Sequence, residues 1–314
     1  MRTINHSQNE TKDLREQILS STMERESVLF SHNQAAFLAD DVAEENDEQA
    51  SKVERKGING SSVNTADAEV QLEASEIDVL AGITGYRTML DFPYLHSTVS
   101  ASLSVITGTS GHRGVHMSRL VLAVQDASKC CDTVEEFATS ILKQVNSEQP
   151  GTQVKCEFDL PFHDQIAKIS IAVSDANPLS YCFLVNGITS CPCSKRISGV
   201  GHMQRATLKL LIESEVPISK NFAGILTELS RCFSYEPVAM LKRKDEAEAV
   251  LAAQENSKFV EDVVRDCLRR FPEAKEIEVT SAESIHMHDA VARWKRKREN
   301  NDEAPLREVP AGVP

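Results

Sequence analysis

The chain has 314 residues, of which 41% are hydrophobic, and a formal net charge of -13. An acidic balance of this size argues against a nucleic-acid partner, because a phosphate backbone repels it. The sequence contains no run of 18 or more apolar residues, so we expect no membrane-spanning segment. The first residues lack the basic-then-apolar pattern of a secretion signal, and we therefore expect a soluble, cytoplasmic protein.

The negative charge is concentrated at the amino terminus. Residues 1–78 contain 7 Lys and Arg against 17 Asp and Glu, and they are rich in Ser, Asn and Gln. Such a composition buries too little apolar surface to offset the entropy lost on ordering. We predict a disordered acidic extension over residues 1–78, a folded body over residues 79–298 and a C-terminal tail over residues 299–314.

The first half of the body combines predicted strands with a helix. Apolar and polar residues alternate over 101–105, 154–158 and 169–173, which is typical of half-buried antiparallel strands. Between the first two segments, Thr133 and Glu136 form a capping-box pattern that predicts the start of a helix.

The second half repeats this order. We predict strands over 181–188, 204–212 and 275–280, and helices over 219–233 and 258–271. Both halves therefore contain strands, helix and strands. This order predicts an α+β fold built from two similar modules. The basic run that begins at Trp294 is expected to be a solvated end of the body.

Two of the eight cysteines, Cys191 and Cys193, precede His202 in a segment rich in Gly, Ser and basic residues. We predict an irregular loop between strands there. Soft metal ligands beside cations are typical of a metal site for an anionic substrate, and the alternative is a thiol pair with an unrelated histidine. No second cysteine pair is placed to complete a structural zinc site, which favours an open metal site and metal-assisted hydrolysis.

Three further clusters offer histidines or carboxylates near cations. The first, residues 111–119, is a Gly-bearing basic turn that we expect ahead of a strand and that suits a phosphate-rich ligand. In the second, residues 241–246, a carboxylate follows three cations, and the alternative is a solvated charge run. The third, residues 283–289, places His286 and His288 on one side of a strand-like segment, where they can ligate a metal or move protons.

Taken together, five motifs resemble those of the type IB GTP cyclohydrolases. They are Arg-Gly-Val-His-Met-Ser-Arg at 113–119, Cys-Pro-Cys-Ser-Lys at 191–195, Leu-Lys-Arg-Lys-Asp-Glu at 241–246, Phe-Val-Glu-Asp at 259–262 and Glu-Ser-Ile-His-Met-His at 283–288. The resemblance covers roughly residues 79–298. It implies a tunnelling fold, homotetramers, a divalent metal (Fe, Mn or Zn) and conversion of GTP to 7,8-dihydroneopterin triphosphate with loss of formate, the first step towards folate-type pterins.

The resemblance also implies a role for individual residues. The expected metal ligands are Cys191, His202, Glu246 and His286, and His288 is expected to move protons during ring opening. Glu261 is expected to accept hydrogen bonds from the guanine edge, as an ionised carboxylate can. For the triphosphate, the candidate cations are Arg113, Arg119, Lys195 and Arg205. Cys193 is expected to be structural rather than a ligand.

Two alternatives remain at this point. An archaeal-type relative would make a cyclic phosphate product from GTP. A non-catalytic tunnelling-fold protein would bind a purine or pterin, and loss of the ligand set would be its signature.

Overall fold

The computed structural model describes residues 77–109, 114–175 and 177–297. The described residues all belong to the unit Gln71–Pro314. The C-terminal tail and nearly all of the predicted acidic extension therefore lie outside the described residues. None of the described helices combines the length and apolarity that crossing a bilayer requires.

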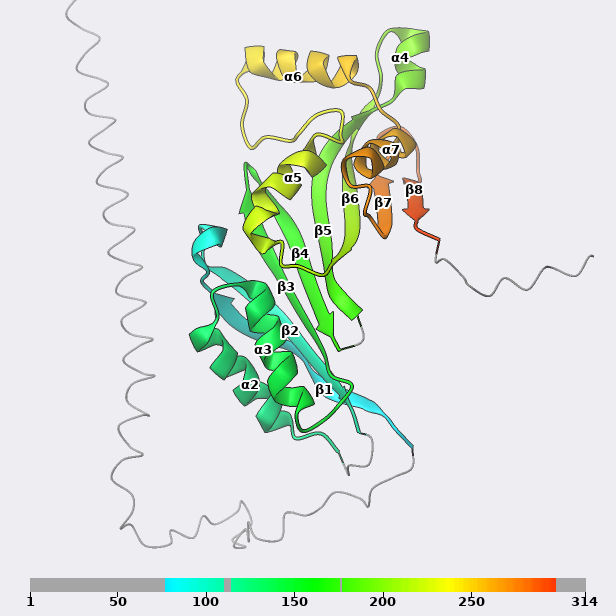
Figure 1. Cartoon of the computed structure of the whole chain (residues 1–314). Helices are drawn as coiled ribbons and strands as arrows, with labels where there is room; N and C mark the ends of the chain where they lie inside the picture. The colour runs from blue at the N-terminus through cyan, green and yellow to red at the C-terminus, as the bar shows by residue number, and fades with distance from the viewer. Residues whose placement is uncertain (1–76, 110–113, 176, 298–314) are drawn as a thin grey trace, which may run out of the picture. The chain divides into compact units, whose positions relative to one another are not determined.

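The described residues form one antiparallel sheet whose eight strands are neighbours in chain order (Figure 1). The strands are β1 (Leu80–Leu90), β2 (Val99–Gly108), β3 (Gln153–Phe162), β4 (Gln165–Ser174), β5 (Asn177–Ser190), β6 (Met203–Ser214), β7 (Glu276–Ser281) and β8 (Ala290–Lys295). The helices are α2 (Met117–Cys130), α3 (Val134–Asn146), α4 (Pro192–Ser198), α5 (Phe222–Ser230), α6 (Arg243–Glu255) and α7 (Val260–Arg270), with short 3-10 turns η2 (Pro93–Leu95) and η3 (Ser219–Asn221).

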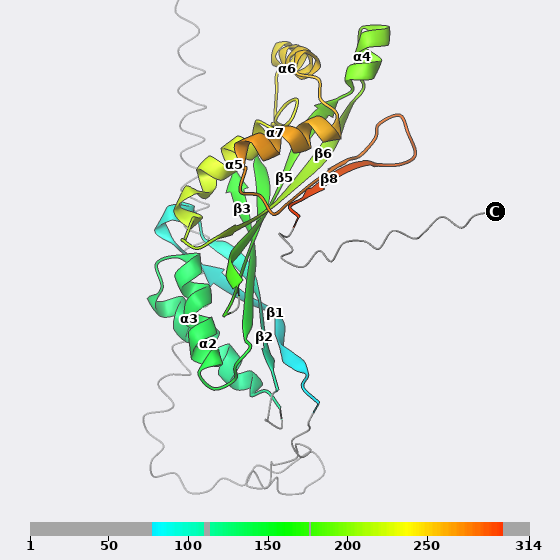
Figure 2. The ribbon, with the colours of Figure 1, turned by 45° about the vertical axis from the view of Figure 1, so that its right-hand side comes forward.

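Helices α2, α3, α5 and α7 cover one face of the sheet (Figure 2). In β3 the residues alternate strictly between exposed and buried, and the buried set, which includes Val154, Cys156 and Phe158, packs into the core beneath α2 and α3. Helices α2 and α3 belong to the half that contains β1–β4, and α5, α6 and α7 belong to the half that contains β5–β8. The predicted α+β tunnelling fold with two tandem modules is confirmed.

A buried carboxylate joins the two halves. Glu135 on α3 is only 2% exposed, and its Oε1 accepts hydrogen bonds from the Tyr181 hydroxyl at 2.9 Å and from the backbone N–H groups of Ile218 and Ser219 at 2.9 and 2.7 Å. The Ser219 hydroxyl donates to Oε2. Four donors, all from the second half, therefore satisfy a carboxylate of the first half.

One glycine permits close packing in the second half. A Cβ on Gly187 of β5 would lie 2.0 Å from the Phe233 ring, so only glycine lets this buried ring lie against the strand. The segment after α5 is thereby held at β5, where Ile188 exchanges backbone hydrogen bonds with residues 234–235. This packing brings the segment that leads to α6 and α7 towards the end of β5.

The predicted helices over 219–233 and 258–271 are confirmed as α5 with η3 and as α7. The predicted helix start at Thr133 is also confirmed, since the Thr133 hydroxyl accepts from the Glu136 N–H at 3.2 Å. The Glu136 side chain, however, caps the N–H of Asp132 and not that of Thr133. The basic run that begins at Trp294 is solvated as expected, since Lys295, Arg296 and Lys297 are exposed. Residues 290–295 nevertheless pair with β7, and Trp294 packs partly buried against the core.

Candidate active site

A cavity of about 250 Å³ lies at one end of β5 and β6, beside the first turn of α7. Its lining includes Cys191, His202, Glu261, Glu283 and His286. These residues come from the ends of β5 and β6, from α7 and from the connection between β7 and β8. The sheet and one helix end thus bring a thiol, two imidazoles and two carboxylates to one cavity.

The expectation of an irregular loop after Cys191 was wrong, because the segment contains α4. Cys191 is the N-cap of this helix, and its sulfur accepts from the Ser194 N–H at 3.4 Å. Pro192 occupies the first turn, where its missing N–H costs nothing, and Gly199 ends the helix in the left-handed conformation with φ 82°. The helix returns the chain so that the N–H of Cys191 donates to the His202 carbonyl at 2.9 Å.

A hydrogen-bonded relay orients the His202 imidazole. Its Nδ1 lies 2.9 Å from the Gln204 Oε1, and the Gln204 Nε2 donates to the Glu283 Oε1 at 3.3 Å. The Glu283 carboxylate lies 3.8 Å from the same Nδ1. With Nδ1 donating to Gln204, the Nε2 lone pair is available for a metal.

His286 and His288 lie on the connection between β7 and β8, which is irregular, so the expected strand-like segment was wrong. Their rings nevertheless stack, with centroids 5.2 Å apart and planes at 12°. The His286 ring meets the His202 ring edge-on at 6.2 Å. His286 therefore lines the cavity, and His288 lies directly behind it.

Glu261 lies in the first turn of α7, where its side chain is exposed to the cavity. The apolar stripe of the helix consists of Val260, Val263, Val264 and Cys267, so Glu261 is not held in the core. Its neighbour Asp262 accepts a hydrogen bond from the Phe259 N–H at 3.1 Å and stabilises the helix start. The first turn of α7 thus presents the Glu261 carboxylate to a ligand in the cavity.

The fourth expected metal ligand, Glu246, does not line the cavity. It lies in the first turn of α6, and its side chain is exposed. Among the described residues, no group of three or more Cys, His, Asp or Glu side chains is close enough to hold a metal ion. One chain therefore brings together three of the four proposed ligands as neighbours without assembling a complete coordination shell.

None of the expected phosphate-binding cations in the described residues lines the cavity. Arg119 pairs with Glu148 and lies in the first turn of α2, so the strand expected after residues 111–119 was wrong. The Lys195 ammonium donates to the Gln254 carbonyl, and Arg205 lies on the opposite sheet face from buried Ala206. Arg113 lies outside the described residues. The exposed Cys193 does not line the cavity either.

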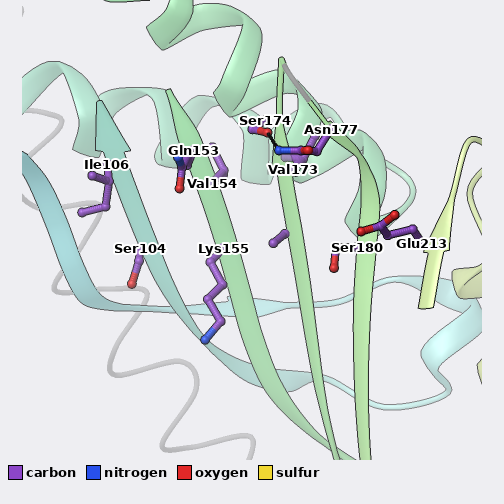
Figure 3. A pocket seen from close by; sticks show the side chains of 11 residues that line it. Ser104, Ile106, Gln153, Val154, Lys155, Val173, Ser174, Asn177, Ser180 and Glu213 are labelled. Carbon is purple, nitrogen blue, oxygen red and sulfur yellow. Dashed lines mark hydrogen bonds between the residues drawn. The ribbon is translucent and has the colours of Figure 1, made fainter. Parts of the chain in front are cut away.

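A wider hollow of about 440 Å³ lies on strands β2–β6, away from this cavity (Figure 3). The described residues that line it include Ser104, Lys155, Ser174, Ser180 and Glu213, but neither cysteine nor histidine. It offers no thiol or imidazole ligand for a transition metal and no proton-transfer imidazole. The chemistry-bearing side chains therefore single out the smaller cavity.

Sequence reasoning assigned no role to Glu283, Gln204 or Lys258, all of which line the cavity. Lys258 is held there by the Cys232 carbonyl at 3.0 Å and by the Asp266 carboxylate at 2.7 Å. Glu283 and Gln204 each lie within a motif that already contains an expected ligand. Their spacing of three and two residues from His286 and His202 was the available signal.

The model of the family described as type I GTP cyclohydrolase folE2 matches residues 68–292. The match spans every element that lines the cavity. The chain belongs to this family.

The individual relatives carry two different names. GTP cyclohydrolase FolE2 of Dictyoglomus turgidum is 32% identical over 200 residues, which cover 57% of this chain and 76% of the relative. GTP cyclohydrolase MptA of Picrophilus torridus is 28% identical over 243 residues, covering 68% and 87%. A crystal structure of uricase from Arthrobacter globiformis is similar over 74% of this chain and 99% of that chain, with a TM-score of 0.45 and 10% identity.

The donors fit the kind of divalent metal that the family implies. A thiol and two imidazoles suit Zn, Fe and Mn, and the hydrogen bond from His202 to Gln204 is the outer-shell contact that metal-binding histidines usually make. Glu246 supplies a hard oxygen donor only if α6 or a second chain brings it closer. The residues therefore fit such a metal by the chemical type of their donors, three of which line one cavity.

Proposed function

We propose that this protein is a metal-dependent GTP cyclohydrolase that converts GTP and water to 7,8-dihydroneopterin triphosphate and formate. The observation that supports this most directly is the cavity in which Cys191, His202 and His286 face Glu261. It occurs in a chain of the type I GTP cyclohydrolase FolE2 family. The enzyme is thus a hydrolase that acts on the cyclic amidine C–N bonds of the guanine imidazole ring.

In this proposal Glu261 binds the base. An ionised carboxylate offers only acceptors, which match the N1–H and the 2-amino group on one edge of guanine. The exposed position of Glu261 in the first turn of α7 leaves both oxygens free for those donors. Binding at that edge directs the imidazole ring of the base, and with it C8, towards the thiol and imidazole side of the cavity.

Cys191, His202 and His286, with Glu246, would hold the metal. When bound, a divalent ion supplies the Lewis acidity that activates water for attack at C8. His288, stacked behind His286, moves protons as the ring opens and formate leaves. The ribose carbons then rearrange and close the pterin ring. Arg113, Arg119, Lys195 and Arg205 remain the candidates for the triphosphate, supplied by this chain or by a neighbouring one.

We further propose a cytoplasmic homotetramer. Glu246 and the candidate cations that the structure describes, Arg119, Lys195 and Arg205, do not line the cavity of their own chain, so an assembly that brings chains together would complete it. Multi-angle light scattering of the purified protein distinguishes a tetramer from a monomer. A monomer that turns over GTP would contradict the tetramer while leaving the activity intact.

The test of activity is incubation of metal-loaded protein with GTP, with formate and the fluorescence of the oxidised pterin measured over time. Equal amounts of both products are expected with at least one of Fe, Mn or Zn. Tight binding of GTP without formate release under all three metals would favour the non-catalytic alternative and contradict the enzyme.

A second candidate product follows from the similarity to GTP cyclohydrolase MptA. An archaeal-type enzyme would release a cyclic phosphate in place of the linear triphosphate. Mass spectrometry of the unoxidised product separates the two, because the cyclic phosphate has lost pyrophosphate. The triphosphate mass is expected.

A further inference from the structure

The Gln254 side chain is built into the backbone beside His202. Its Nε2 donates to the Gly201 carbonyl at 2.7 Å, and its Oε1 accepts from the Gly201 N–H at 2.7 Å. Gln254 is only 9% exposed, and Gly201 is buried. A glutamine amide thus pairs with both backbone groups of one residue, as a neighbouring strand would.

The same residue ties three elements together. The backbone carbonyl of Gln254 accepts from the Lys195 ammonium on α4 and from the Ser257 hydroxyl. Gln254 itself lies in the last turn of α6. Glu246 lies in the first turn of the same helix. The last turn of α6 is therefore fixed to the segment that leads into His202.

Gly201 has no room to move. A Cβ at this position would lie 2.6 Å from the Cys191 carbonyl oxygen, 2.8 Å from the Ser190 Oγ and 3.1 Å from the Gln254 Oε1. The next residue, His202, accepts the hydrogen bond from the Cys191 N–H. A shift of Gly201 would therefore move both Cys191 and His202.

We propose that Gln254 is a positioning residue that fixes the backbone of Cys191 and His202 relative to one another for metal binding. The inference rests on the proposed function, because it concerns the same ligands. Gln254 touches no reacting atom. It acts by replacing water on the two polar groups of Gly201, which keeps the backbone in one conformation before the metal arrives.

The test compares Gln254→Met with Gln149→Met. Methionine matches the length of glutamine but provides neither of the two strong hydrogen bonds. Gln149 is a matched control, since it is 6% exposed and donates to a backbone carbonyl, that of Gly114, in the other half of the sheet. Each full-length variant is stripped of metal and titrated with Co²⁺, whose visible spectrum reports on the coordination geometry.

Gln254→Met is expected to bind Co²⁺ at least about tenfold more weakly than wild type, in the range typical for loss of supporting contacts. Hydrogen exchange in the metal-free protein should also accelerate at residues 200–203. Gln149→Met should change neither value. Wild-type affinity in Gln254→Met, or an equal loss in both variants, would overturn the positioning role.

Two measurements keep the inference separate from the proposed function. If Gln254→Met fails to fold, Gln254→Asn replaces it, because its amide is one methylene too short to make both bonds and the same loss is expected. If wild-type protein binds Co²⁺ but releases no formate from GTP, the proposed function fails and the Co²⁺ comparison still decides the role of Gln254.

Discussion

The N–H of Cys191 donates a hydrogen bond to the carbonyl of His202 at 2.9 Å, across the base of α4. Ten residues lie between these two in the sequence, and α4 folds from them. The last ladder pair of β5 and β6 joins Ser190 to Met203, so this bond extends the hairpin by one step. The sheet therefore sets the distance between the thiol and the imidazole.

Loss of the Cys191 thiol should abolish turnover. We expect Cys191→Ala to lower kcat at least about 100-fold, since loss of contacts around ligands alone costs 10- to 100-fold. The measurement is formate release from GTP at saturating metal. The matched control is Cys193→Ala, which removes an exposed thiol of the same helix and should leave kcat within about twofold. Equal losses in both would remove Cys191 from the ligand set.

Glu261 should control substrate affinity and not metal affinity. We expect Glu261→Ala to raise the KM for GTP about 10- to 100-fold, because hydrogen bonds to charged groups contribute about 1.5–3 kcal/mol. Asp262→Ala is the comparison: it removes the helix-start bond to Phe259 and should cost about 1 kcal/mol of stability without this rise. An unchanged KM in Glu261→Ala would mean that another group binds the base.

Glu135 should stabilise the contact between the two halves. We expect Glu135→Ala to lower the free energy of unfolding by about 3 kcal/mol or more, because it leaves the hydroxyl of Tyr181 and the donors at 218–219 unsatisfied. Urea denaturation followed by circular dichroism measures this. Glu136→Ala removes one exposed cap and should cost less than about 1 kcal/mol. Similar values for the two would show that the buried network contributes little.

Glu276 should make the fold sensitive to acid. Burial raises the pKa of this carboxyl, but the hydrogen bond and charge of Lys209 and the charge of Lys295 outweigh burial, so the pKa lies below its ordinary value of 4.5. A lowered pKa in the folded state stabilises the fold above pH 4.5, and this contribution disappears as the pH falls through the folded pKa.

Glu276→Gln should therefore be slightly less stable than wild type at pH 7, by less than about 1 kcal/mol because the pair is partly exposed to solvent. The two proteins should converge as the pH falls through the lowered pKa of Glu276 in the folded state. Thermal unfolding at a series of pH values and two salt concentrations tests this. A difference that is constant across pH would exclude the ion pair as its cause.

Local patterns predicted much of the fold. The alternation at 154–158 became β3, and the apolar stripe from Val260 to Cys267 became α7, because one buried face imposes its period on the sequence. Strand β1 and helix α2 were not predicted. The buried positions of α2 are Leu120, Ala123, Val124 and Ala127, and two alanines among four give a weak apolar signal.

The histidine motif shows a different limit. Two imidazoles one residue apart were correctly expected on one side of the chain, yet no strand holds them there. Instead, the two rings stack on one another within an irregular connection, and this stacking places both imidazoles on one side. A local pattern can therefore predict which side chains meet while missing the backbone that brings them together.

The sequence by itself determined the family and the two-module order, and it supplied the proposed residues for a metal and a purine, because these depend on local spacing and motif identity. Only the tertiary structure decided that Cys191, His202, His286 and Glu261 share one cavity while Glu246, Arg119, Lys195 and Arg205 do not line it. It also supplied Glu283 and Gln254. Such contacts join positions 50 to 80 residues apart, and only the pairing of strands and the packing of helices sets those distances.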